Sequence, residues 1–127
     1  MASQFTKHYT LAEARALLPQ IRAWLEQLHE LTAQLEKSGR VIHELLTAGN
    51  DAGGPTVNRW VRALVDFREV LREFQTREIQ LKDLDRGLLD FPAIMDGREV
   101  FLCWESGEDD IEFWHDLETG YAGREPL

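Results

Sequence analysis

The pattern of apolar positions predicts one long helix over the first third of the chain. Apolar or small residues recur at spacings of three and four, which is typical of a helix that packs along one side. Thr10 and Glu13 fit a capping box at its start, and Pro19 predicts a kink because proline removes a backbone donor. This heptad seam comprises Leu11, Ala14, Leu18, Ile21, Leu25, Leu28, Thr32, Leu35, Gly39, Ile42 and Leu46.

A second helix is predicted after the stretch "AGNDAGGPT", residues 48–56, whose glycines and proline interrupt helical structure. Thr56 is the expected cap, and the helix should run to about Glu78. Because the connection is short, the two helices should form an antiparallel helical hairpin over residues 10–78. The apolar stripe of the second helix comprises Val57, Trp60, Val61, Leu64, Phe67, Leu71 and Phe74.

After Ile79 the apolar positions alternate, which indicates strands. The pair Asp96-Gly97 is a strong hairpin signal between two alternating runs. A two-residue turn there would place an apolar face toward the helices and would put Asp90 opposite Cys103 on the other face. Pro92 cannot donate to a strand ladder, so its strand should lie at an edge or carry a bulge.

A third strand, residues 111–115, can pair in two registers. We favour a four-residue turn that places Trp104 opposite Ile111 and Val100 opposite His115, because three apolar rows then align. In that register Cys103 and His115 point to opposite faces. A slip by one residue would instead bring His115 to the face of Cys103, Asp90 and Glu105.

The predicted fold is therefore α+β: one domain, residues 1–127, with a long antiparallel helical hairpin packed on a small three-stranded antiparallel β-meander. The meander should occupy residues 79–116, and residues 117–127 should be a coil anchored by Tyr121. A hydrophobic content of 43% and a charged content of 29% agree with one globular domain of 127 residues.

Charge and cysteine content narrow the function classes. The net charge of −9, with acidic residues concentrated near the C-terminus, would repel phosphate backbones, so we expect no nucleic-acid binding. We expect no membrane association, because neither a spanning run nor a signal peptide is apparent. The single cysteine excludes an internal disulfide and favours a cytoplasmic location.

The stretch "CWESGEDDIEFWHD", residues 103–116, contains the residue types of a metal or catalytic site. Cys103, His115 and a carboxylate could ligate zinc, but no paired-ligand spacing such as C-x-x-C is present. Cysteine catalysis would need His115 as base and Asp90 to orient it. Both hypotheses depend on the slipped register, so we expect a structural role and no catalysis.

Several segments resemble the DUF2203 family of small prokaryotic proteins. They are "LAEARALLPQIR", "LKDLDRGLLDFPAIMDGREVFLCWESGE", "WH" and "GYAGREPL". The resemblance covers the whole chain and is most specific in its C-terminal third. The chain departs from the family in "TREIQLKDLD", where a glycine is common before "KDLD", and this bears on where the second helix ends.

The matching block supplies the candidate binding residues Asp90, Cys103, Glu108, His115 and Arg124. It also contains the architectural residues Gly87, Pro92, Gly97 and Trp104. Asp90 and His115 are titratable groups on strands, which hold a geometry better than loops do. For Arg124 we favour a salt bridge that pins the tail onto the acidic sheet.

Two functions follow as hypotheses. We favour a non-catalytic interaction or assembly protein, which pairs with a second copy or another helical protein through the seam residues Leu35, Ile42 and Leu46. The alternative is a small-ligand or metal-binding protein, and possibly an enzyme, with its site on the C-terminal meander, between the meander and the helices, around Asp90, Glu108 and His115. No cofactor is predicted under the first hypothesis, and a divalent metal is the candidate under the second.

Overall fold

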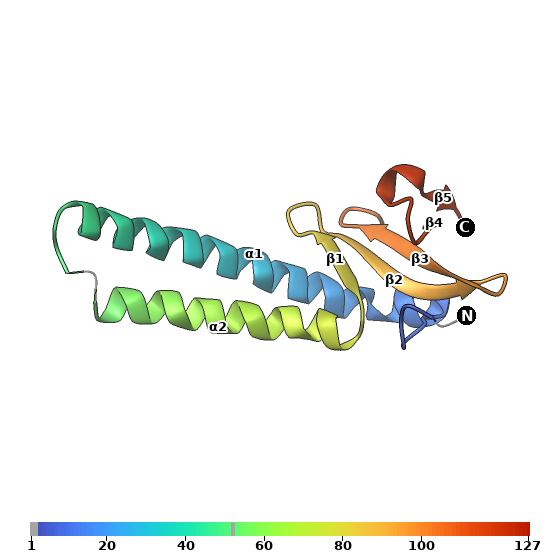
Figure 1. The fold of residues 1–127 in the computed structure, drawn as a ribbon, viewed down its shortest axis with the longest axis horizontal. Helices are drawn as coiled ribbons and strands as arrows, with labels where there is room; N and C mark the ends of the chain where they lie inside the picture. Colours follow the sequence, from blue (N-terminus) through green and yellow to red (C-terminus); the bar gives the residue numbers. More distant parts are fainter. Residues whose placement is uncertain (1–2, 52) are drawn as a thin grey trace.

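The computed structural model describes residues 3–51 and 53–127, and it has two long helices followed by an antiparallel sheet (Figure 1). The α+β class is confirmed, but the sheet has five strands in chain order and not the predicted three. Ala52, within the predicted interhelical loop, and residues 1–2 lie outside the described residues. The elements are α1 (Leu11–Thr47), α2 (Pro55–Thr76), β1 (Gln80–Asp83), β2 (Leu88–Met95), β3 (Arg98–Glu105), β4 (Phe113–Asp116), the 3-10 helix η1 (Tyr121–Gly123) and β5 (Glu125–Pro126).

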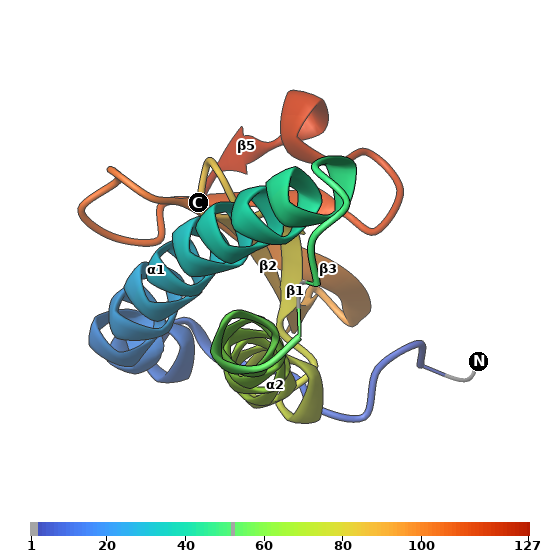
Figure 2. The same cartoon turned by 90° about the vertical axis from the view of Figure 1, so that its left-hand side faces the viewer.

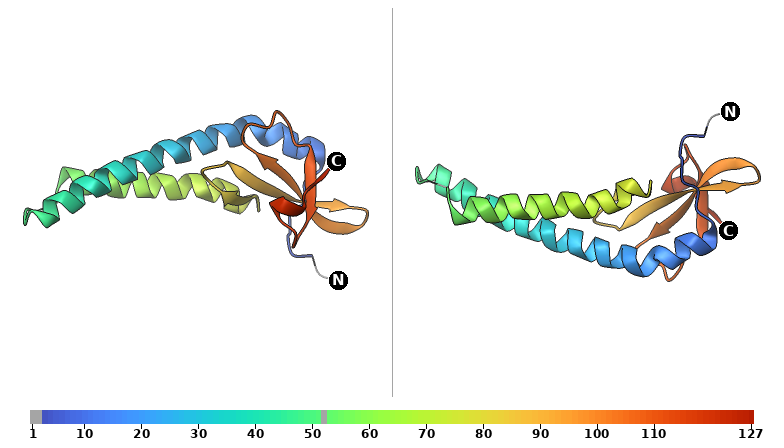
Figure 3. Two further views of the ribbon diagram at one scale, coloured as in Figure 1. Left: turned by 90° about the horizontal axis from the view of Figure 1, so that it is seen from above. Right: turned by 90° about the horizontal axis from the view of Figure 1, so that it is seen from below.

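The predicted capping box begins α1. The backbone N–H of Glu13 donates to Thr10 Oγ1 at 3.1 Å, and the Thr10 N–H donates to Glu13 Oε1 at 2.9 Å. The helix continues through Pro19 without a break. Its axis changes direction over the N-terminal, blue part, as the two views of Figure 3 show.

The boundaries of α2 differ slightly from the prediction. Gly54, with a φ of 81°, is the N-cap and Pro55 occupies the first turn, so Thr56 lies inside the helix and does not cap it. Proline suits the first turn because its missing N–H would lack a helical partner there anyway. The helix ends at Thr76, before the predicted Glu78.

The sheet packs against one end of the helical hairpin, and the rest of the hairpin extends beyond it (Figures 1 and 2). The buried residues of α1 belong to its first half and end at Leu28. We call residues 31–47 and 55–66 the distal arm. The core between helices and sheet includes Leu18, Ile21, Leu25, Leu28, Phe74, Leu89, Phe91, Val100, Leu102 and Trp104.

The predicted pairing of β2 with β3 is confirmed, including Leu89 with Trp104 and Asp90 with Cys103. The turn residues Asp96 and Gly97 have φ values of 51° and 80°, as a type I′ turn requires. Pro92 lies in an interior strand, yet β1 pairs only with residues 88–90 of β2. At Pro92 the strand is therefore locally an edge, which removes the conflict with its missing N–H.

The favoured register of the third predicted strand is wrong, and the alternative is right. Phe101 pairs with His115 and Leu102 with Trp114, one residue away from the favoured register. The reason lies in the loop before β4. Ile111 is fully buried in the core but precedes the strand, and Glu108 accepts hydrogen bonds from the Trp104 indole and the Glu105 N–H.

The C-terminal segment is more ordered than the predicted coil. β5 pairs with β4, and the N–H of Leu127 donates to the Glu112 carbonyl at 2.9 Å. Tyr121 anchors this segment, because its hydroxyl donates to Glu105 Oε1 at 3.2 Å. Among the described residues, neither helix has a stretch apolar and long enough to cross a membrane.

Candidate metal centre

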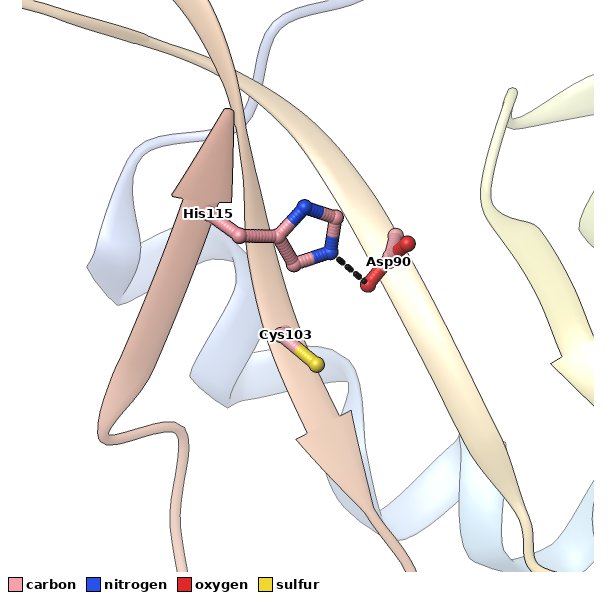
Figure 4. A group of neighbouring side chains, drawn as sticks. All are labelled: Asp90, Cys103 and His115. Atoms are coloured by element: carbon pink, nitrogen blue, oxygen red, sulfur yellow. Dashed lines mark hydrogen bonds and ion pairs between the residues drawn. The ribbon is translucent and has the colours of Figure 1, made fainter. Parts of the chain in front are cut away.

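Asp90, Cys103 and His115 meet on the sheet face that points away from the helices, so the predicted position of the site between sheet and helices is wrong. Each comes from a different strand, β2, β3 and β4, so the register of three neighbouring strands brings them together (Figure 4). Side chains alternate between the two faces of a strand. Since Leu89, Phe91 and Leu102 belong to the core, their neighbours Asp90 and Cys103 face the other way.

The three side chains are buried and close. The exposed fractions are 2% for Asp90, 0% for Cys103 and 2% for His115. His115 Nε2 lies 3.0 Å from Asp90 Oδ1. One ligand atom from each residue lies within 4.8 Å of the other two. Buried polar groups this close are either partners of one another or ligands of a common atom.

One ring nitrogen of His115 is held by a backbone carbonyl. Nδ1 lies 2.6 Å from the carbonyl oxygen of Asp116. A carbonyl can only accept, so Nδ1 carries the proton in this contact. In the neutral imidazole, Nε2 then presents a lone pair toward the Asp90 carboxylate. Two acceptors are stable at 3.0 Å only if a proton or a metal cation lies between them.

The Cys103 thiol is held in its neutral form in the absence of a metal. Burial raises the pKa of this thiol to about 12, and the nearby Asp90 carboxylate acts in the same direction. A hydrogen bond from Arg124, 3.8 Å from the sulfur, opposes this shift. A neutral, buried thiol is a poor nucleophile. Both nitrogens of His115 are also engaged by Asp90 and Asp116, so His115 is not available as a base for Cys103.

Arg124 and Glu108 form the outer wall of the cluster. The guanidinium of Arg124 donates to both carboxylate oxygens of Glu108, at 3.2 and 2.6 Å. Burial opposes its charge, but the bonds to Glu108 and Cys103 outweigh burial and raise the pKa of Arg124. The predicted salt bridge that pins the tail is confirmed. All five candidate residues therefore lie around the Cys103 sulfur or one contact away from it.

Aromatic rings complete the surroundings of the cluster, and their contacts with it could not be predicted from the sequence. The Arg124 guanidinium lies 4.0 Å from the ring centre of Phe113 and 4.3 Å from that of Tyr121. The Phe101 ring lies 5.4 Å from the His115 ring. Of these rings, only Tyr121 was expected from the sequence as an anchor, and the positions of Phe101 and Phe113 beside the cluster follow from the strand register.

The comparison with known proteins gives one match. The model of a family described as "Uncharacterized conserved protein (DUF2203)" matches residues 7–127. No curated protein and no solved structure matches the chain significantly.

Proposed function

The chain belongs to the DUF2203 family, and we propose that it binds a divalent transition metal ion, with zinc as the best fit, through Asp90, Cys103 and His115. The observation that carries this proposal is the orientation of His115. Its Nδ1–H donates to the Asp116 carbonyl, so in the neutral imidazole the Nε2 lone pair points at Asp90. Metal-ligating histidines have this arrangement, in which the second nitrogen donates to a carbonyl or carboxylate.

The donor set also supports zinc. Zinc takes cysteine sulfur, histidine nitrogen and carboxylate oxygen at about 2.0–2.3 Å in a tetrahedral arrangement, so its ligand atoms lie roughly 3.3–3.6 Å apart. The 3.0 Å contact of Nε2 with Oδ1 is near this value. The widest separation allowed here, 4.8 Å, would have to shorten by about 1 Å through side-chain rotation.

Charge balance favours a divalent ion. The Asp90 carboxylate and a Cys103 thiolate together neutralise two positive charges, and His115 binds as the neutral imidazole. Metal coordination displaces the thiol proton despite its raised pKa. Three protein ligands leave one coordination position for water or a small anion.

Arg124 would stabilise the thiolate form. Its N–H groups face the Cys103 sulfur and Glu108 at the same time. Because Glu108 balances the guanidinium charge, Arg124 can donate a hydrogen bond to the thiolate without adding net charge beside the metal. Such partners of metal ligands commonly affect metal affinity by about 10–100-fold.

Metal content and cobalt spectroscopy test the proposal. Protein purified without chelator should contain close to one metal ion per chain by elemental analysis. Co²⁺ added to the metal-free protein should give a near-ultraviolet thiolate-to-cobalt band and visible bands typical of tetrahedral coordination. Zinc at 100 times its dissociation constant should stabilise the fold by about 2.7 kcal/mol.

Matched variants locate the ligands. Cys103→Ser should abolish the thiolate band, and His115→Gln should weaken Co²⁺ binding by at least tenfold. His43→Gln, at an exposed position of α1, is the control and should bind like the wild type. Folded wild-type protein that contains no metal and shows no thermal shift with Zn²⁺ or Co²⁺ would contradict the proposal, and Asp90 and His115 would then be a buried ion pair.

A further inference from the structure

A second feature of the molecule lies on the hairpin, away from the candidate metal centre. Two adjoining grooves, of about 480 and 410 Å³, run along one side of α1 and α2. They share Gln34 and Asp66, so together they form one continuous groove centred on these two residues. We call it the hairpin groove. Its half nearer the sheet contains Trp24, and its half nearer the helix tips contains Val41.

The two halves of the hairpin groove carry opposite charge. Glu30, Glu69 and Glu73 line the half near the sheet. Lys37, Arg59 and Arg62 line the half near the tips. A solvated surface normally mixes the two signs. This separation gives the groove a direction, with a negative end and a positive end.

The charges are placed symmetrically about the centre. On α2, Glu73 and Arg59 each lie seven residues from Asp66, about 10 Å along the axis in opposite directions. On α1, Glu30 and Lys37 lie four and three residues from Gln34 on opposite sides. A rotation by 180° about an axis that crosses both helices at this level therefore brings Glu30, Glu69 and Glu73 each opposite a basic residue, whereas Asp66 at the axis meets its own counterpart.

We propose that the hairpin groove is the interface of an antiparallel homodimer, in which a second copy of this chain packs groove to groove with the two-fold axis near Gln34 and Asp66. In this arrangement α1 packs on α1 and α2 on α2, and each helix runs opposite to its counterpart. Lys37 of one copy faces Glu30 of the other, and Arg62 faces Glu69. The result is a four-helix bundle made from two hairpins.

Charge also disfavours the parallel arrangement. If the two hairpins packed with their tips at the same end, the three glutamates of one copy would face the same glutamates of the other. Like charges placed opposite one another disfavour a complex and select the alternative register. In the antiparallel arrangement, glutamates face basic residues in both halves of the groove.

The burial of the distal arm supports a protein partner there. Over the described length of α1, full burial ends at Leu28, and Leu35 and Ile42 are only partly buried. Val41, which lines the groove, is 38% exposed. Two helices alone cannot surround an apolar seam, whereas a four-helix bundle can. Leu46, one of the seam residues proposed from sequence, is 62% exposed, and the groove residues would contact the second copy.

Sedimentation velocity over a concentration series, with the full-length wild type at low and high salt, tests the interface. We expect a dimer that dissociates more readily as salt rises, because exposed ion pairs are screened. Wild-type protein that stays monomeric at low salt and millimolar concentration would overturn the proposal.

A charge swap tests the antiparallel arrangement. Lys37→Glu/Arg62→Glu and Glu30→Lys/Glu69→Lys should each be monomeric alone, because like charges then meet across the axis. An equimolar mixture of the two variants should form a heterodimer, since each of the altered pairs again joins opposite charges. All four side chains are exposed in the single chain, so the variants should fold and keep the metal-binding behaviour of the wild type.

The control is Arg68→Glu/Arg72→Glu, which makes the same charge change at exposed positions of α2 outside the hairpin groove. It should dimerise like the wild type. If it dissociates as much as Lys37→Glu/Arg62→Glu, net charge alone governs association and the specific interface is refuted. Failure of the mixed variants to associate would also refute it.

A cysteine at the two-fold axis gives a second, independent readout. Asp66→Cys in a Cys103→Ser background should form an intermolecular disulfide under mild oxidation, because each copy would meet its own counterpart there. Glu36→Cys, exposed on α1 outside the groove, is the control and should remain reduced. Equal cross-linking at both positions would contradict a two-fold axis near Asp66.

Discussion

At the scale of single residues, the cluster depends on side chains whose chemistry is set by their surroundings. Cys103 is fully buried, and burial keeps its pKa near 12. His115 has one nitrogen fixed by a backbone carbonyl and the other beside Asp90. Each of these residue types is common in structural roles. Only the short distances between the three side chains make them candidate metal ligands.

The metal-free protein should have an unreactive thiol. At pH 8 the Cys103 thiol is neutral, because its pKa lies far above this pH, and it is inaccessible to reagents. Labelling with a thiol reagent in chelator should therefore require unfolding. Ser106→Cys adds a thiol at an exposed position, and this second thiol should react at once. Equal rates for both thiols would show that the cluster opens readily.

The capping box of α1 should contribute measurably to stability. Thr10→Ala removes the acceptor of the Glu13 N–H and should lower the free energy of unfolding by about 1 kcal/mol. Thr47→Ala, at the other end of α1, is the control and should change it by less than about 0.5 kcal/mol. Chemical denaturation at pH 7 measures both, and equal losses would argue against a capping role.

The stability that this capping box contributes should depend on pH. Hydrogen bonds from the Thr10 backbone and side chain lower the pKa of Glu13 below its ordinary value of 4.5. A lowered pKa contributes stability above pH 4.5 that is lost as the pH falls through the lowered value. The difference between wild type and Thr10→Ala should therefore shrink below about pH 4. A difference that grows in acid would contradict this assignment.

At the scale of elements, the turns and loops decide how strands pair. Asp96-Gly97 sets the β2–β3 register locally, which is why the sequence predicted it correctly. The loop between β3 and β4 holds its shape through Glu108 and Trp104 and inserts Ile111 into the core. The hydrogen bonds of Glu108 are local in sequence, but the packing of Ile111 into the core and its contact with Arg15 of α1 are not, so the favoured register was wrong by one residue.

Gly87, at the turn before β2, should be intolerant of a side chain. Its φ of 63° favours glycine, and an added Cβ would lie 2.6 Å from Ser106 Cβ. Gly87→Ala should lower the free energy of unfolding by roughly 1–2 kcal/mol, because alanine is strained in the left-handed region, and by the further cost of this clash. Gly97 has a φ of 80° and open space around it, so Gly97→Ala should be destabilised by the strain alone. Thermal unfolding compares them, and equal losses would show that the clash is relieved by small shifts.

At the scale of the whole molecule, stability should be uneven along the hairpin. The sheet and the first half of α1 share one core, whereas the distal arm extends beyond the sheet (Figure 1). An arm of two helices buries less apolar surface per residue than the region under the sheet. The proposed metal centre and the proposed dimer interface therefore lie in parts of different local stability.

Hydrogen exchange should reveal this difference. In monomeric protein, amides of α1 after Leu31 should exchange faster than amides of β2 and β3, because local opening exposes little apolar area there. In the wild type at concentrations that favour the dimer, protection of the distal arm should rise while that of the sheet stays constant. Uniform protection along α1 at every concentration would contradict the uneven stability.

Features that depend on neighbouring residues could be predicted from the amino-acid sequence. These are the two helices, the capping box, the Asp96-Gly97 hairpin and the opposition of Asp90 to Cys103, since each depends on spacing within a few residues. Tertiary structure alone decided the position of His115, the added strands β1 and β5, and the closure of Arg124 over Cys103. A one-residue shift reverses the face of every side chain in a strand. The core needed Ile111 from the loop, and that long-range packing placed the imidazole beside the thiol.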